Sequence, residues 1–537
     1  MPRSGSSANV LPPRPFRLVA GAGLALAIAA LVLLLLWSIL TAASAEPATA
    51  APIDVLHLLG MTTIQAALST VLSLLAGTAL AWALNRLRFP GRGLVVALFA
   101  SAIVTPGIVV GFGLLAIWGR NGWINQALQA AFGVSIGNPV FGLTGIVAAH
   151  VILNGAFAAR ILLARLDAIP VSRLKTGQSL ALSARQRFAV IDWPAIGATL
   201  PGLGAIIFLL AFTSFPIVLL LGGGPANQTL EVAIYAAVRL DFDLRGAVTL
   251  ALVQIAVCSV IILAASALTP VSTSPGPSAG QNWCDRPLAQ TWQWLVLALG
   301  LFGFALPLLS VLAGGFGKDF FLVTSRPSFW SAALASLCIG AASALLALAL
   351  GLVLAMSRAA TAGPLVRIGL GAAAYGYLAV PAVVLALGFF LLVRRLGIDP
   401  GDAAPVVVIV ANALLALPFA VATLAPPLDA VARGRGKLMR SLGLSGARQF
   451  ALIEFPLIGR EIGVVLALAF CFSLGDLGVI ALFGTSEFAT LPLLLLRALG
   501  AYRGNDAAVI AALMLAISIV VFAGLPRLFE RLAHAHP

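Results

Sequence analysis

The sequence predicts an all-α integral membrane protein whose twelve transmembrane helices form two fused six-helix halves. Of its 537 residues, 61% are hydrophobic and only 9% are charged, whereas a soluble domain carries roughly 25% charged residues. Apolar runs long enough to span a bilayer recur twelve times along the chain. The two halves of the sequence also repeat each other in one register. Lipid must therefore solvate much of this chain.

Each apolar run of about 20 residues predicts a spanning helix, because an open strand would leave its backbone polar groups unsatisfied in lipid. The predicted spans are Leu18–Ala43, Leu58–Leu84, Leu94–Trp118, Val140–Leu163, Ile196–Leu221, Gly246–Leu268, Trp294–Phe316, Phe329–Met356, Ile368–Val393, Pro405–Ala425, Ile462–Phe483 and Ala507–Leu525.

The positive charges set the expected orientation. The net charge is +14, but the basic residues lie in short segments between apolar runs, a pattern that membrane topology requires and that argues against nucleic acid as a partner. With twelve spans, the basic N-terminal tail and the basic loops around Arg173 and Arg448 all fall on one side. We expect that side, with both termini, to be cytoplasmic. Arg394 and Arg395 fall on the outer side and are the clearest exception.

The repeat and a linker define the predicted domains. Thr269–Leu288 is rich in Ser, Pro and Gly, as linkers are, so we divide the chain into 1–268, a linker at 269–290, and 291–537. A shift of 262 residues places Ser179–Ser183 on Ser441–Ser445, and Phe188–Pro194 on Phe450–Pro456. Because six helices separate the copies, they lie on the same membrane side, and the repeat is parallel.

The repeated stretches lie in long loops, 166–194 and 428–456, each between the fourth and fifth helices of its half. Each combines apolar residues at helical spacing, a small residue at a turn, and an amphipathic stretch that ends in proline. This pattern predicts a short helix lying across the membrane face, with a joint at Ala181 or Gly443. A basic loop held by membrane lipid headgroups is the alternative, which the duplication disfavours. The candidate coupling residues are Leu180, Ala181, Phe188, Pro194, Leu442, Gly443, Phe450 and Pro456.

The stretch from Gly443 through Ile453 to Pro456 resembles the EAA loop of binding-protein-dependent ABC importer permeases. The resemblance implies that the two loops dock on two copies of a cytoplasmic ATP-binding-cassette ATPase. Lys437-Leu438-Met439 lacks the acidic-alanine start of that loop, and Ala181 replaces its glycine in the first copy. We therefore expect a less mobile turn or weaker docking in the first copy.

A second set of motifs is made up of Trp118–Trp123, Leu221–Pro225, Thr229–Tyr235, Ser473–Gly484 and Thr490–Pro492. Through these stretches, nearly the whole chain resembles the thiamine transporter permease family. The resemblance implies a multi-pass protein of the bacterial inner membrane that translocates thiamine and its phosphates, delivered by a periplasmic thiamine-binding protein. Fused iron(III) permeases share this layout and are the main alternative; an ion-coupled secondary transporter is a weaker one.

No enzyme chemistry is expected of this chain. Gly436-Lys437 is followed by Leu438 rather than Ser or Thr, so it does not make a phosphate-binding loop. We expect the chain to bind no cofactor, and ATP to be used by the partner ATPase. The sequence contains no CxxC or Cys/His cluster that would predict a metal site. It also contains no paired carboxylates or nucleophile–base arrangement.

Asp476 is the sharpest single candidate for the translocation path. It lies in the apolar run Ile462–Phe483, where an ionised group is costly and usually faces a cavity or a partner. The alternative is a packing aspartate, hydrogen-bonded to backbone or to Ser473, and both interpretations stand. The 262-residue shift pairs Asp476 with Ser214. Ser473, Ser214 and Asn154 complete the candidate path residues.

Overall fold

The computed structural model describes residues 15–45, 53–266, 285–361, 363–375 and 380–534. Every regular element in these residues is a helix, which confirms the all-α expectation. Within the described residues, ten helices are long and apolar enough to cross a membrane, or eleven if 184–197 and 200–212, bent by 55°, form one span. The expected linker lies largely outside the described residues. The count of twelve spans stays a prediction.

Four predicted spans are interrupted helices. The run Leu94–Trp118 breaks at Pro106, and Ile196–Leu221 breaks before Pro216. Ile368–Val393 is helical up to Tyr375 and again after Pro381. Proline removes a backbone donor and restricts the preceding residue, so it ends helices even inside apolar sequence. The fourth break, in Ile462–Phe483, has no proline and falls at Asp476.

The chain forms two compact units. Unit 1 comprises residues 1–45, 333–490 and 518–537, and unit 2 comprises 46–332 and 491–517. The described helices of unit 1 are α1 (Pro15–Ala45), most of α16 (Pro327–Ala359), α17 (Pro364–Tyr375), α18 (Ala382–Arg395), α19 (Pro400–Ser441), α20 (Gly446–Gln449), a π-helix (Phe450–Glu454), α21 (Phe455–Gly475), α22 (Gly478–Phe483) and the end of α24 (Gly504–His534).

Unit 2 holds the remaining helices. They are α2 (Val55–Arg86), α3 (Arg92–Ala100), a 3₁₀ turn (Ser101–Val104), α4 (Gly107–Trp118), α5 (Trp123–Phe132), α6 (Leu143–Asp167), α7 (Val171–Ser179), α8 (Ala184–Arg187), a π-helix (Phe188–Asp192), α9 (Trp193–Gly197), α10 (Leu200–Phe212), α11 (Pro216–Leu221), a 3₁₀ turn (Pro225–Asn227), α12 (Leu230–Arg239), α13 (Leu244–Ser266), α14 (Pro287–Gly315), α15 (Phe320–Thr324), α23 (Leu491–Gly500) and the start of α24.

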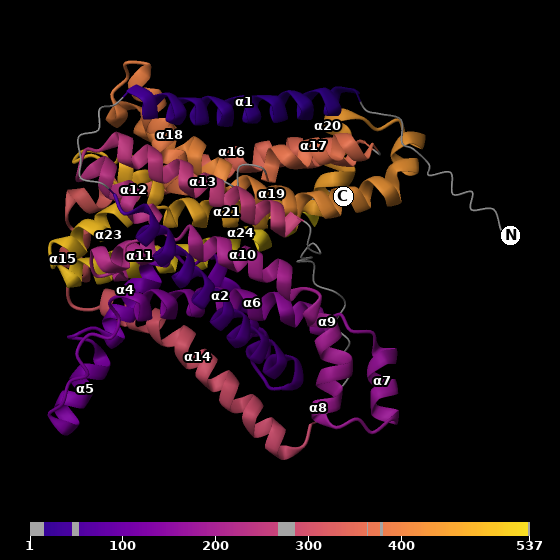
Figure 1. Cartoon of the computed structure of the whole chain (residues 1–537). Coiled ribbons are helices and arrows are strands. Elements are labelled where there is room, and N and C mark those ends of the chain that lie inside the picture. The colour runs from indigo at the N-terminus through magenta and orange to yellow at the C-terminus, as the bar shows by residue number, and fades with distance from the viewer. Residues whose placement is uncertain (1–14, 46–52, 267–284, 362, 376–379, 535–537) are drawn as a thin grey trace. The chain divides into compact units, whose positions relative to one another are not determined.

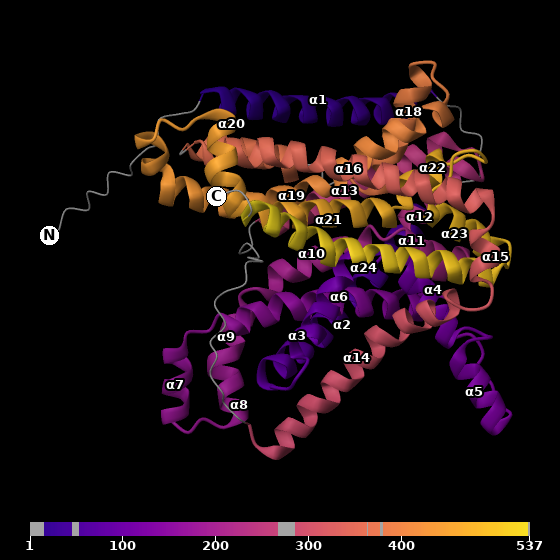
Figure 2. The same ribbon diagram turned by 180° about the vertical axis from the view of Figure 1, so that it is seen from behind.

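Two long helices, α1 and α14, pack against helices that are distant from them in sequence. In unit 1, α1 runs beside α17 and α18 (Figure 1), and a Cβ added to Gly388 of α18 would lie 3.1 Å from Leu35 of α1. In unit 2, α14 packs on α2 and α4 (Figure 2), and a Cβ added to Gly300 would lie 2.2 Å from Leu80 of α2. Small residues allow such close approach between apolar helices. We call α1 and α14 the exchanged helices, because each packs on helices from beyond residues 267–284.

Candidate functional site

The loop 428–456, here called coupling segment 2, turns sharply after α19. Gly443 follows the helix with a φ of 62°, and the backbone N–H of Leu444 donates to the carbonyl of Met439 at 2.9 Å. This bond closes a Schellman-type helix end, which requires a left-handed residue at its turn. Met439 and Ile453 are buried together with Leu444 packed against them. The turn is therefore anchored by apolar contacts on its inner side.

The loop 166–194, here called coupling segment 1, makes the same turn with another residue. Ala181 follows α7 with a φ of 48°, and the N–H of Leu182 donates to the carbonyl of Gly177 at 3.2 Å. Ser183 and Gln186 then form a capping box that starts α8. A left-handed conformation costs a residue with a Cβ about 1–2 kcal/mol. Segment 1 thus adopts the turn at a cost that Gly443 avoids.

The tips of both turns expose apolar side chains. Leu180 is 67% exposed and Leu442 is 59% exposed. The rings of Phe188 and Phe450 are only partly buried, and each lies near an aromatic ring five residues along its own segment, at 6.2 and 6.1 Å between centroids. Exposed apolar side chains on a fixed turn suit docking to a partner protein. Pro194 is exposed and Pro456 is partly buried.

The end of the π-helix in coupling segment 2 carries Glu454, which receives a two-pronged ion pair from α1. Arg17 donates from Nη1 to Oε1 at 2.7 Å and from Nη2 to Oε2 at 2.9 Å. Gln449 also donates to Oε1 of Glu454. The side chains of Arg17 and Glu454 are 15% and 5% exposed. We call Arg17, Gln449 and Glu454 the Glu454 cluster.

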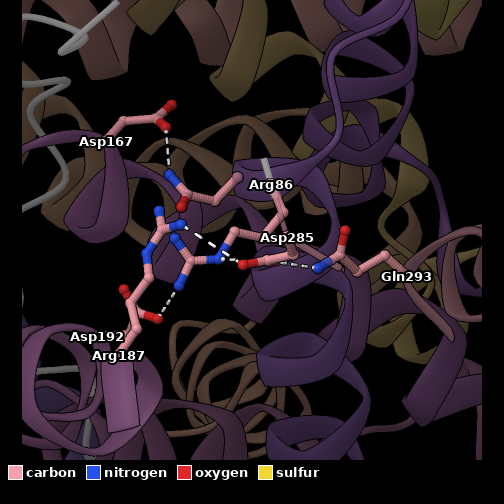
Figure 3. Close-up of polar contacts among 7 residues, drawn as sticks. Arg86, Asp167, Arg187, Asp192, Asp285 and Gln293 are labelled. Atoms are coloured by element: carbon pink, nitrogen blue, oxygen red, sulfur yellow. Dashed lines mark hydrogen bonds and ion pairs between the residues drawn. The ribbon is translucent and has the colours of Figure 1, made fainter. Parts of the chain in front are cut away.

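The equivalent residue of coupling segment 1, Asp192, lies in a larger network (Figure 3). It forms an ion pair with Arg86, at the end of α2. Asp285, just before α14, lies 3.5 Å from Nε of Arg86 and 3.7 Å from Nη1 of Arg187, and accepts from Gln293 at 2.7 Å. Two arginines thus face two carboxylates, all at most 5% exposed. We call Arg86, Arg187, Asp192 and Asp285 the Asp285 cluster.

A further acidic residue lies near the N-terminal end of each coupling segment. Asp167, at the end of α6, accepts from Asn85 at 3.0 Å and lies 3.7 Å from Arg92. Asp429, inside α19, pairs with Arg367 of α17. These contacts fix the helix that leads into each segment. Among the described residues, no group of three or more His, Cys, Asp or Glu could hold a metal ion.

The candidate path residues lie at or near breaks in apolar helices. Asp476 occupies the gap between α21 and α22, where its Oδ1 accepts from the N–H of Val479 at 3.3 Å. Its Oδ2 is buried and makes no hydrogen bond among the described residues. One turn earlier, Ser473 accepts from Asn412 at 2.9 Å and lies 3.4 Å from the hydroxyl of Ser343. The carboxylate therefore caps α22 and keeps one free oxygen.

The first half of the chain has a comparable break without a charge. Ser214 lies between α10 and α11 and is buried. Asn154 is buried in α6. Nearby in the same unit, the side chain of Gln65 donates to the carbonyl of Ala211 at 2.7 Å, and Ser69 bonds to His150 at 3.1 Å. The structure thus places Ser473 near Asp476, within unit 1, and keeps Ser214 and Asn154 in unit 2.

Sequence reasoning missed the two ion-pair clusters. The available signal was the acidic residue before an aromatic–proline pair in both copies, at Asp192 and Glu454. Arg17, which pairs with Glu454, and Asp285, which contacts Arg86 and Arg187, lie far away in sequence at the starts of the exchanged helices. No periodicity in the sequence connects them.

Comparison with known proteins finds transport system permease proteins. The chain is 38% identical to a thiamine transport system permease protein of Brucella melitensis over 455 residues, covering 84% of this chain and 83% of the relative. It is 35% identical to the protein of that name in Escherichia coli, covering 88% and 89%. A molybdenum transport system permease protein of Escherichia coli is 26% identical over 210 residues, which cover 38% of this chain and 89% of the relative. No family model matches the chain.

Proposed function

The chain belongs to the family of thiamine transport system permease proteins, and from that premise we propose that it carries thiamine across the bacterial inner membrane as part of an ATP-driven importer. The proposal rests on a sequence identity of 34–38% to relatives of that name over more than four fifths of the chain. The chain is a multi-pass permease subunit and not an enzyme. We infer that the phosphorylated forms of thiamine are carried as well.

Two partners follow from this role. Two copies of an ATP-binding-cassette ATPase dock on the exposed turns that carry Leu180 and Leu442, and a periplasmic thiamine-binding protein delivers substrate on the opposite side. The permease itself binds no cofactor, and the ATPase consumes the ATP. The basic loops around Arg173 and Arg448 support a cytoplasmic position for both coupling segments and both termini.

We further propose twelve spans in two parallel six-helix halves, 1–268 and 291–537, joined at 269–290. The matching offsets of the helices support the repeat. The segments α8 and α20 begin at Ala184 and Gly446, each is followed by a five-residue π-helix, and α11 and α22 begin at Pro216 and Gly478. All three correspond at the offset of 262 residues found in the sequence. The molybdenum permease, matched along 89% of its length by 38% of this chain, supports a half as a unit.

The helix breaks at Ser214 and at Asp476 support a path for substrate. Broken helices inside a membrane are tolerated where they line a cavity or are buried in protein. We propose that Asp476, with Ser473, Ser214 and Asn154, lines the path.

Thiamine carries a permanently positive thiazolium ring, so a carboxylate attracts it, whereas the phosphates of thiamine pyrophosphate are repelled. Asp476→Asn should therefore slow uptake of thiamine more than uptake of thiamine pyrophosphate. Equal losses would assign Asp476 to packing.

Reconstitution tests the function directly. The permease, with its ATPase in the same vesicles and its binding protein outside, should accumulate labelled thiamine only when ATP is enclosed. A matched vesicle with an ATPase that cannot hydrolyse ATP should accumulate none. Uptake driven by an ion gradient without ATP, or uptake of ferric ion in place of thiamine, would overturn the proposal.

A further inference from the structure

The two ion-pair clusters share a position relative to the exchanged helices. In unit 1, Arg17 lies in the first turn of α1 and holds Glu454, the last residue of the π-helix. In unit 2, Asp285 lies two residues before α14 and contacts Arg187, directly before the π-helix, and Arg86, which also holds Asp192. Each cluster therefore ties the start of an exchanged helix to a coupling segment.

The polarity of the tie is reversed between the units. In the Glu454 cluster the exchanged helix supplies the cation and the coupling segment supplies the carboxylate. In the Asp285 cluster the residue before the exchanged helix supplies the carboxylate, and Arg187 of the coupling segment supplies a cation. The same connection is thus made with opposite charges. A contact that follows only from one copied sequence would keep its polarity.

Burial makes these ties stiff. The four charged side chains of the Asp285 cluster are at most 5% exposed, and Glu454 is 5% exposed. Separating buried ions leaves charges without compensation in a medium of low dielectric constant, which is strongly unfavourable. Gln449 and Gln293 donate further hydrogen bonds to Glu454 and Asp285. Movement of a coupling segment must therefore carry the attached helix with it or break the cluster.

The connectivity of the chain gives this attachment a consequence. The helix α1 continues in sequence towards α2, and α14 continues through α15 into α16. Coupling segment 2 is thus tied to a helix that leads into the first half of the chain, and coupling segment 1 to a helix that leads into the second half. Each coupling segment is therefore attached to a helix that belongs to the other half of the sequence.

We propose that Arg17 and Glu454 in one unit, and Asp285 with Arg86 and Arg187 in the other, are positioning residues that transmit movement of each coupling segment to the exchanged helix. Synchronous movement of the two halves depends on these ties. The inference rests on the proposed function, since the movement is driven by the ATPase. Residues on a coupling route change the coupling without touching substrate or nucleotide.

The first test measures thiamine taken up per ATP hydrolysed in reconstituted vesicles. Glu454→Gln should lower this ratio by roughly two- to thirty-fold, the range that single residues on a coupling route produce. The double reversal Arg17→Glu with Glu454→Arg should restore much of it. The Met/Met double variant of the same pair keeps the packing without charge, and should fold while retaining a low ratio. Uptake and hydrolysis that fall in proportion, leaving the ratio unchanged, would overturn the proposal.

The chain offers a matched control. Arg326 and Asp506 form an ion pair in unit 2, between the start of α16 and α24, far in sequence from both coupling segments. Replacement of this pair by Met/Met should leave the ratio of uptake to hydrolysis at the wild-type value. An equal fall of the ratio for this pair would show that loss of any ion pair uncouples the protein, which contradicts a specific role for the clusters.

A second readout does not depend on the substrate. Spin labels at Leu26→Cys on α1 and Ser445→Cys in coupling segment 2, in a background with the native cysteines replaced by serine, report the distance between the two elements. The distribution of that distance should stay narrow with and without ATP in the otherwise wild-type protein, and it should broaden in the Glu454→Gln variant. A narrow distribution in the variant would overturn the inference even where thiamine uptake is normal. Failure of wild-type thiamine uptake with a broadened variant distance would count against the proposed substrate alone.

Discussion

Coupling segment 2 turns on Gly443 at a φ of 62°, whereas coupling segment 1 turns on Ala181 at a φ of 48°. Both turns close with a hydrogen bond from the residue after the turn to a carbonyl five residues earlier. The backbone path is therefore the same, although one residue adopts it freely and the other at a cost. The turn therefore keeps its shape in both segments, and glycine is only the least costly residue at that position.

The two coupling segments also differ in the charged groups that hold them. The Asp285 cluster holds coupling segment 1 with four almost fully buried charges, whereas the Glu454 cluster holds coupling segment 2 with an ion pair in which Arg17 is 15% exposed. The segment with the more strained turn thus has the stronger attachment. We infer that segment 1 is the more rigid of the two.

The largest expected effect is on stability, at the Asp285 cluster. Asp192→Asn leaves two buried arginines facing one carboxylate, and breaking a buried pair in this way costs about 3–5 kcal/mol. Glu454→Gln should cost less, about 1–3 kcal/mol, because Gln449 and the partly exposed Arg17 can be satisfied by hydrogen bonds. The free energy of unfolding, measured by denaturant titration in detergent micelles, checks both values. Equal losses would remove the proposed difference in rigidity.

Gly443→Pro should abolish transport. Proline holds φ near −65°, which is incompatible with the left-handed turn at this position. We expect the variant to insert into the membrane but to lose thiamine uptake and co-purification of the ATPase. Gly133→Pro is the matched control, because Gly133 has a φ of 67° at the end of α5, outside both coupling segments. It should retain the ATPase, and retention by Gly443→Pro would contradict the docking role.

The sequence was sufficient for the helical membrane fold and for the location of both turns. The register of the repeat alone aligned Ala181 with Gly443. It was not sufficient for the breaks, because an apolar run shows that a segment enters lipid and not that its helix is continuous. Pro216 gave a local signal for one break, whereas the break at Asp476 had none beyond Gly475 and Gly478.

The packing of α1 and α14 could not be read from sequence either. Both helices are apolar on all sides, so no face predicts a partner. The contact of Arg17 with Glu454 joins residues separated by 437 positions. A charge at a helix end indicates only that it lies near the membrane surface. Long-range ion pairs of this kind require the three-dimensional structure.

The smallest and most discriminating effect is expected from exchanging the two turn residues. Ala181→Gly removes a left-handed strain of about 1–2 kcal/mol but gives the unfolded chain about 0.5–1 kcal/mol more conformational entropy. The net expectation is a gain of about 0.5–1 kcal/mol in the free energy of unfolding, and Gly443→Ala should lose a similar amount. Because segment 1 is held by four buried charges, Ala181→Gly should change uptake less than Gly443→Ala does. The double exchange should have near wild-type stability, since the turns lie far apart in sequence and belong to different compact units. A destabilising Ala181→Gly would mean that the alanine methyl makes a favourable contact, and the two turns would then not be equivalent.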